Sequence, residues 1–307
     1  MKWATRINYM KDAKVWIWVS VALSIAGIIA YLVMGFNKGI DFTGGELYDI
    51  QYTGTVTSAQ VEKVATAITD KASVQIATAT GSVTGVSEFY LRTPELTPEN
   101  EKKLMDALNG VGTMKLISQD EVSGTVSGEL TQRAILAVVI AALLQIVYLW
   151  IRFELKFGVT AVIALLHDVL ITCGLVAIFR IPINSPFVAA ILTILGYSIN
   201  DTVIVFDRIR ENLARRKKGE SLVDLTTRSI QEVITRSLYT VFTVQFAIIA
   251  LLIWGGPTIR DFIWSLFIGI TSGMYSSIFI AAALWVFWEQ YDRDKHKNMA
   301  KSKPAKA

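Results

Sequence analysis

The feature that most constrains this chain is a set of long apolar runs separated by short charged links. A bilayer core about 30 Å thick needs about 20 consecutive apolar residues per helix. Of the 307 residues, 52% are hydrophobic and only 18% are charged, whereas soluble domains carry roughly 25% charged residues. We expect six membrane-spanning helices, at residues 15–36, 134–151, 157–179, 186–206, 237–254 and 262–288.

The first apolar run could instead be a cleaved signal peptide. The apolar core of a signal peptide is usually about 7–15 residues long and is followed by small residues at the cleavage site. This run is longer and ends in Leu32-Val33-Met34-Gly35-Phe36. We therefore favour an uncleaved first helix.

The distribution of Lys and Arg predicts the orientation. Basic residues are concentrated in the N-terminus (1–14), in a loop near 207–236 and in the tail (289–307), while two alternate links hold only Arg180 and Arg260. Cytoplasmic loops of membrane proteins carry an excess of Lys and Arg. Both termini and the basic loop are therefore predicted to be cytoplasmic, with residues 133–288 forming a five-helix bundle.

Residues 37–132 then lie outside the membrane and have the pattern of a small α+β domain. Alternating apolar residues predict strands at 46–52, 74–78, 88–93 and 114–118. A capping box at Thr57 opens one helix, and Thr97 followed by Pro98 opens another. The order β-α-β-β-α-β fits a ferredoxin-like unit.

Catalytic and metal-binding motifs are absent from the sequence. It has no phosphate loop (G-x-x-x-x-G-K-[ST]), no H-E-x-x-H and no G-x-S-x-G. His167, His296 and the single cysteine, Cys173, are too few for a metal site built on His or Cys. We expect no enzymatic activity, cofactor, metal or nucleic-acid partner, and we interpret Cys173 as a small buried apolar residue.

Ionisable residues within the spans are the strongest functional signal. Asp168 lies beside His167 in the third span, Asp201 lies beside Asn200 in the fourth, and Arg236 enters the fifth. A charge at bilayer depth costs from about 2.5 to more than 10 kcal/mol, and such groups usually line a functional path. We predict that these five residues take part in proton coupling. The alternative is that they are structural pairs or snorkelling helix ends.

Polar residues also form stripes on three of the spans. The fourth and fifth spans each carry a polar face, which suggests that they meet, and the small residues of the sixth allow close helix packing. Asp207 and Arg208, at the end of the fourth span, are expected to be solvated. The three stripes are Thr193, Gly196, Tyr197, Asn200 and Asp201; Arg236, Thr240 and Thr243; and Ser265, Gly269, Ser272, Gly273 and Ser276.

The sequence resembles the SecF family of protein-export membrane subunits over nearly its whole length. The matching strings are GIDFTGG at 39–45, HDV at 167–169, GYSINDTVIVFDRIREN at 196–212, RDF at 260–262 and SGMYSSIF at 272–279. Within them, the family-motif residues are Gly39, Asp41, Gly44, Gly45, Asp207 and Arg208.

This resemblance implies a function. SecF-like proteins form half of an RND-type membrane domain in the bacterial inner membrane. They pair with SecD, assist the SecYEG channel and use the proton gradient to help pull the translocating polypeptide outward. In the family, the carboxylate matching Asp201 and the arginine matching Arg236 are implicated in proton passage. Protonation of Asp201 would then weaken its attraction to Arg236 and let the helices repack.

Two departures from the family pattern are visible. Gln231-Glu232 stands where the family usually has an Asn-Gln pair, which adds a carboxylate near Arg236, and the proline usual near Gly124 is missing.

Two other functions remain open at this point. The chain could be a passive scaffold whose charges only hold SecD, although small residues alone would serve that purpose. An RND-type exporter of small molecules is a weaker alternative, because six spans are half of the usual set and the external domain is small.

Overall fold

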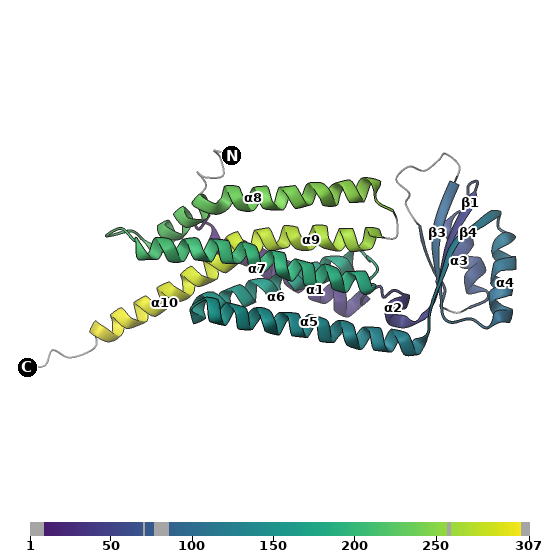
Figure 1. Ribbon diagram of the computed structural model, residues 1–307, viewed down its shortest axis with the longest axis horizontal. Coiled ribbons are helices and arrows are strands. Elements are labelled where there is room, and N and C mark those ends of the chain that lie inside the picture. The colour runs from purple at the N-terminus through teal and green to yellow at the C-terminus, as the bar shows by residue number, and fades with distance from the viewer. Residues whose placement is uncertain (1–8, 70, 77–85, 257–258, 302–307) are drawn as a thin grey trace, which may run out of the picture.

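The computed structural model describes residues 9–69, 71–76, 86–256 and 259–301. A bundle of long helices makes up one end of the elongated molecule, and a small sheet covered by two helices makes up the other (Figure 1). These two parts have separate apolar cores.

Six helices of the described residues are long and apolar enough to cross a membrane, as the sequence predicts. They are α1 (Ala13–Met34), α5 (Gly124–Arg152), α6 (Leu155–Ile178), α7 (Ser185–Ala214), α8 (Leu222–Trp254) and the pair α9 (Arg260–Ser276) and α10 (Ala282–Lys301). α9 and α10 are joined by a π-helical turn, η3 (Ser277–Ala281). This turn was not predicted.

Helices α5, α7, α8 and α10 extend beyond the expected spans, and α10 continues to Lys301. α5 begins at Gly124, where the Ser123 hydroxyl accepts a hydrogen bond from the Val126 amide. α8 begins at Leu222, after the capping residue Ser221. α7 continues to Ala214, so the basic loop expected near 207–236 is mostly helical.

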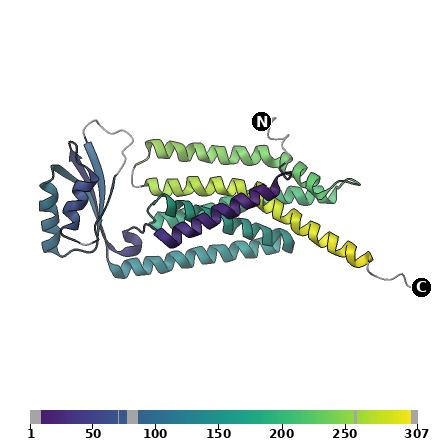
Figure 2. The same ribbon diagram turned by 180° about the vertical axis from the view of Figure 1, so that it is seen from behind.

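Close helix packing in the bundle depends on glycine at two crossings. Gly27 of α1 and Gly174 of α6 meet backbone to backbone, so that a Cβ atom built on either would lie under 3.0 Å from the other's Cα. Gly269 of α9 receives the side chain of Ile194 from α7. Viewed from behind, α1 crosses the bundle diagonally (Figure 2).

The external domain contains one antiparallel sheet of four strands. The strands are β1 (Gly45–Thr53), β2 (Ser73–Ile76), β3 (Val86–Thr93) and β4 (Thr113–Val122), in the order β2-β3-β1-β4. This order confirms the ferredoxin-like prediction. Of the predicted second strand, residues 77–78 lie outside the described residues.

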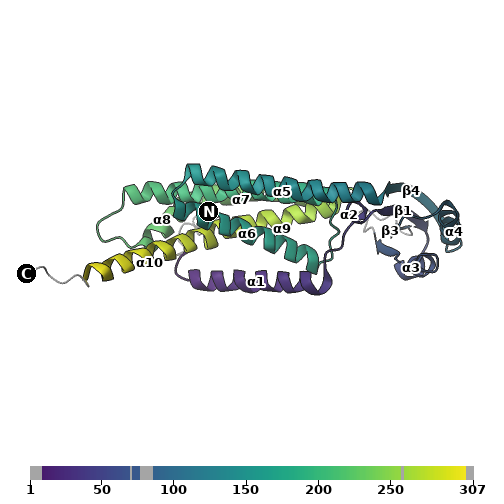
Figure 3. The same cartoon turned by 90° about the horizontal axis from the view of Figure 1, so that it is seen from below.

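Two helices cover one face of this sheet, as the view from below shows (Figure 3). α3 (Ser58–Thr66) and α4 (Pro98–Asn109) bury Tyr48, Ile50 and Tyr52, which alternate along β1. The predicted capping box at Thr57 and the cap at Thr97 are both present. A short helix, α2 (Ile40–Thr43), connects α1 with β1.

Candidate functional site in the helix bundle

Asp168 lies at the centre of a polar cluster deep in the bundle. Its side chain is 0% exposed, and three serine hydroxyls from two other helices donate to its carboxylate. The distances to Ser198 of α7, Ser272 of α9 and Ser276 of α9 are 2.6, 2.8 and 2.6 Å. These hydrogen bonds satisfy the buried carboxylate and tie α6, α7 and α9 together.

His167 supplies a fourth contact to this carboxylate. Its Nδ1 atom lies 3.0 Å from Asp168 Oδ1. The other ring nitrogen, Nε2, is buried and has no hydrogen-bond partner among the described residues.

Asp201 is the second buried carboxylate and lies nearer the bundle surface. Asp201 is 7% exposed, and its carboxylate accepts a hydrogen bond from the hydroxyl of Ser277. Ser277 is the first residue of the π-helical turn. π-Helical turns are rare and occur frequently at functional sites. Ser276 and Ser277, adjacent in sequence, thus contact the two different carboxylates.

A small cavity of about 20 Å³ lies beside Asp201. This volume is enough for one water molecule. The cavity is bordered by Asn200 and Tyr197 of α7 and by Thr240 of α8. The predicted meeting of the polar faces of the fourth and fifth spans therefore takes place here.

Arg236 lies close enough to Asp201 to act on it electrostatically, but no ion pair joins their side chains among the described residues. Within the part of the chain that the structure describes, no carboxylate lies within 4.0 Å of the Arg236 guanidinium. Arg236 is exposed on α8, together with Thr240 and Thr243. Asn200 and Tyr197 are exposed on α7 beside them.

The ends of α5, α7 and α8 opposite the sheet are held by ion pairs. Arg152 forms a two-pronged pair with Asp207, at 2.7 and 2.8 Å. Arg208 pairs with Glu232 at 2.5 Å. Asp207 and Arg208 are thus paired across helices rather than simply solvated. Glu232 joins this network through Arg208 and Arg228, and among the described residues it does not pair with Arg236.

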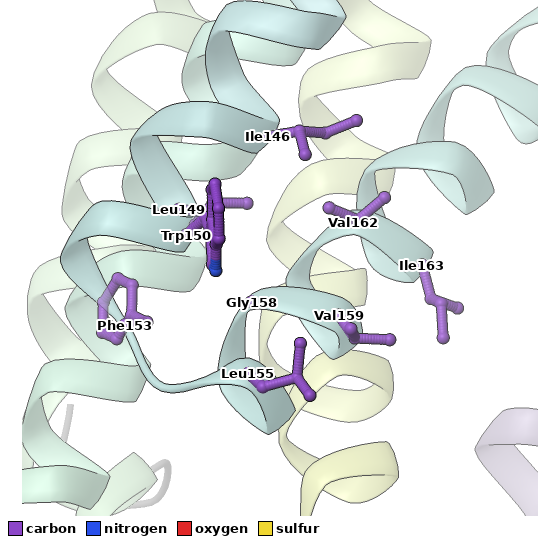
Figure 4. A pocket seen from close by; sticks show the side chains of 9 residues that line it. All are labelled: Ile146, Leu149, Trp150, Phe153, Leu155, Gly158, Val159, Val162 and Ile163. Atoms are coloured by element: carbon purple, nitrogen blue, oxygen red, sulfur yellow. The ribbon is translucent and has the colours of Figure 1, made fainter.

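An apolar groove with a volume of about 270 Å³ lies between α5 and α6 near their connecting turn (Figure 4). Its lining includes Trp150, Leu155 and Val162 but no titratable side chain. We therefore exclude it as the proton site.

Serine contacts are the part of the site that sequence reasoning missed. Ser272 and Ser276 were expected only to allow close packing, yet both donate to Asp168. Ser198 and Ser277 were not singled out. The spacing of Ser272 and Ser276 could have indicated these contacts. The two serines lie one turn apart on the same face of α9, so a single carboxylate can reach both.

Comparison with known proteins places this chain in a family. The model for "Protein export membrane protein SecD/SecF, C-terminal" matches residues 103–291. "Protein translocase subunit SecF" of Acidaminococcus fermentans is 38% identical over 287 residues, which cover 93% of this chain and 98% of the relative. The chain belongs to the SecF family.

Structures related to SecF agree with this assignment. The crystal structure of SecDF from Thermus thermophilus matches with a TM-score of 0.81 and 31% identity, over 93% of this chain and 39% of that one. SecDF in its super-membrane-facing form matches with a TM-score of 0.69 over 97% of this chain and 40% of that one. The SecF-family chain thus spans about two fifths of the SecDF chains.

A longer relative also matches this chain over only part of its own length. "Protein translocase subunit SecDF" of Bacillus subtilis is 36% identical over 88% of this chain and 36% of its own length. The residues 39–45 lie before the region that the family model covers.

Proposed function

We propose that this SecF-family chain pairs with SecD in the bacterial inner membrane, with both termini cytoplasmic, and that the pair uses the proton gradient to assist translocation of polypeptides through SecYEG. The observation that carries the proposal is the Asp201 carboxylate, which is buried in a spanning helix beside a cavity with room for one water. An ionisable group at this depth is functional by default.

The contacts of Asp201 suggest how a proton changes the bundle. An ionised Asp201 accepts a hydrogen bond from the Ser277 hydroxyl, whereas a protonated Asp201 can donate one. The Ser277 hydroxyl oxygen also lies 3.0 Å from the Met274 carbonyl oxygen, one turn earlier in α9. Protonation would turn the Ser277 hydroxyl toward that carbonyl. A serine that bonds back to its own helix tends to bend it.

The polar face beside Asp201 supports a partner in the membrane. Asn200, Arg236, Thr240 and Thr243 are exposed in the isolated chain. Charged groups facing hydrocarbon are costly and usually pair with other protein groups. We propose that SecD covers this face and supplies a carboxylate to Arg236.

Asp168 and His167 belong to the proposal as the second ionisable pair. The specific observation that favours the scaffold alternative also lies here, because the Asp168 side chain is 0% exposed and its carboxylate is held by Ser198, Ser272 and Ser276. If all the buried charges behaved like Asp168, the chain would hold helices together without moving protons. Asp201 and Asp168 must therefore be tested separately.

The test is proton-gradient-dependent completion of export in membrane vesicles that carry SecD and the Asp201→Asn variant. Asn keeps the shape of Asp and can still accept the Ser277 hydrogen bond, so we expect normal protein levels and loss of the gradient-dependent part of export. Normal export with normal gradient dependence would make Asp201 structural and overturn the proposal.

Two further variants serve as comparisons. Leu195→Ala, on another face of α7, removes a side chain that is 4% exposed and should lower stability more than coupling. Arg236→Lys should lose part of the coupling, since an ammonium group lacks the fork geometry of guanidinium. Protein levels of both subunits are followed by blotting.

A further inference from the structure

The segment before the sheet is bound tightly to the turn between α6 and α7. Gly39 N donates to Ile183 O and Ile183 N donates to Asn37 O, each at 2.9 Å. The Asn37 side chain donates to Arg180 O at 2.9 Å. The Arg180 guanidinium reaches back to the carbonyls of Met34 and Gly35 at the end of α1. The two segments therefore form one hydrogen-bonded unit.

Asp41 completes this unit by capping α7. The N-cap residue of α7, Asn184, makes no capping hydrogen bond with its own side chain. The Asp41 carboxylate accepts one instead, from the Ser185 amide at 2.7 Å. A carboxylate at this position satisfies an otherwise free amide and interacts favourably with the helix dipole. The cap of the helix that carries Asp201 thus comes from a remote segment.

Two glycines in this segment sit where no larger residue would fit without a clash. A Cβ atom on Gly39 would lie 1.4 Å from Asn184 Oδ1. Gly45 has φ of +109° and would place a Cβ 2.2 Å from Thr93 O. Gly45 is also the first residue of β1, which pairs with both β3 and β4. Only a few residues therefore separate the α7 cap from an interior strand of the sheet.

We propose that Asp41 is the positioning residue that transmits displacement of α7 to the external domain. This inference rests on the proposed function, in which protonation of Asp201 changes its contact with Ser277 and so shifts α7 relative to α9, against which it packs. Asp201 lies about 24 Å along α7 from its capped end, at 1.5 Å per residue. A helix is stiff over this length, so a shift or tilt caused at Asp201 reaches Ser185, Asp41 and then β1. The glycine-rich motif at residues 39–45 is therefore a rigid connection between α7 and β1 rather than a flexible linker.

The experiment measures movement of the external domain directly. Spin labels are attached to Lys102→Cys on α4 and Leu166→Cys on α6, both exposed positions, in full-length Cys173→Ala protein reconstituted with SecD. The distribution of distances between the two labels is measured in four proteins. These are the protein with both aspartates, the Asp201→Asn variant, the Asp41→Ala variant and the double variant. We expect Asp201→Asn to shift the distribution when Asp41 is present, and the shift to be lost with Asp41→Ala.

The outcomes separate the inference from the proposed function. A shift that persists unchanged with Asp41→Ala overturns the role of Asp41 and leaves the proposed function standing. No shift even with Asp41 present overturns the movement on which both rest. Ser123→Ala is the matched control, because it removes a cap from α5 instead of α7, and it should keep the shift.

A second pair of variants keeps the test valid if Asp41→Ala folds poorly. Gly39→Ala should abolish the shift, since the new methyl group collides with Asn184. Asn184→Ala removes the colliding atoms, and Asn184 makes no side-chain cap to lose. The double variant Gly39→Ala/Asn184→Ala should therefore recover the shift. Failure of this recovery, with normal protein levels, would contradict the inference.

Discussion

At the scale of single residues, Asp49 of β1 shows how burial changes a carboxylate outside the membrane. It is 8% exposed, and its Oδ1 atom has no hydrogen-bond partner among the described residues. Burial, with a smaller contribution from Glu88, raises the pKa of Asp49 from 3.8 to about 6. The unfolded chain ionises near pH 4, so the folded domain loses stability as the pH rises from about 4 to about 6.

We predict that Asp49→Asn stabilises the external domain at pH 7.5 by about 1–3 kcal/mol and has little effect at pH 4, because one pKa unit corresponds to about 1.4 kcal/mol. The measurement is hydrogen exchange of the β1 and β3 amides in the full-length protein, converted to opening free energies at both pH values. Asp106→Asn, an exposed carboxylate of the same domain, should change neither value. Equal stabilisation at the two pH values would rule out the ionisation argument.

At the scale of helices, the Asp168 cluster is the feature that ties α6, α7 and α9. Each serine hydroxyl that donates to a charged group contributes about 1.5–3 kcal/mol. We predict that Ser198→Ala, Ser272→Ala and Ser276→Ala each lower stability in this range, and that Asp168→Asn lowers it more because the amide group faces donors. The effects should be non-additive, since all four residues share one network.

Cys173 offers the measurement. It is the only cysteine in the sequence and lies partly buried on α6, so its reaction with a thiol dye during heating reports opening of the bundle. Asn has the same shape as Asp, and position 201 lies nearer the bundle surface than position 168. Asp201→Asn should therefore shift the midpoint temperature of dye reaction much less than Asp168→Asn. Equal shifts would mean that both carboxylates are structural ties of the same kind.

At the scale of the whole molecule, the external domain has its own core and is joined to the bundle by the motif before β1 and by α5. We predict that deletion of residues 54–115, which keeps both connections, leaves a protein that still inserts and associates with SecD but does not support export. Blotting, co-purification and vesicle export are the three measurements. Full export activity would show that the domain transmits no force.

The orientation in the membrane is tested at the opposite end. Lys218→Cys in a Cys173→Ala background should react only with reagents that enter the cytoplasm, because Lys218 lies in the basic turn between α7 and α8. Lys218 is preferable to its neighbour Gly219, which has φ of +86° and would strain a cysteine. Reaction from outside would contradict the cytoplasmic placement of both termini.

Much of this organisation was predictable because it depends on local patterns. Apolar run length predicts the spans, and alternation predicts strands such as β1. The π-helical turn was not predictable, because Ser277–Ala281 has an ordinary helical composition and lies where α1, α6 and α7 pack together. The partners of Asp168 and Glu232 were also missed, since contacts between helices depend on rotation and register that no single helix encodes.

The length of α5 has a further consequence. It runs unbroken from Arg152, through the membrane, to Gly124 beside β4, and most of its surface is not covered by the rest of the chain. At 1.5 Å per residue it is about 43 Å long. A tilt of about 5° around its Arg152 end would carry Gly124 sideways by about 4 Å, close to the spacing of neighbouring strands. A small tilt of α5 about its Arg152 end would therefore be amplified into a displacement of several ångströms at the end that adjoins β4.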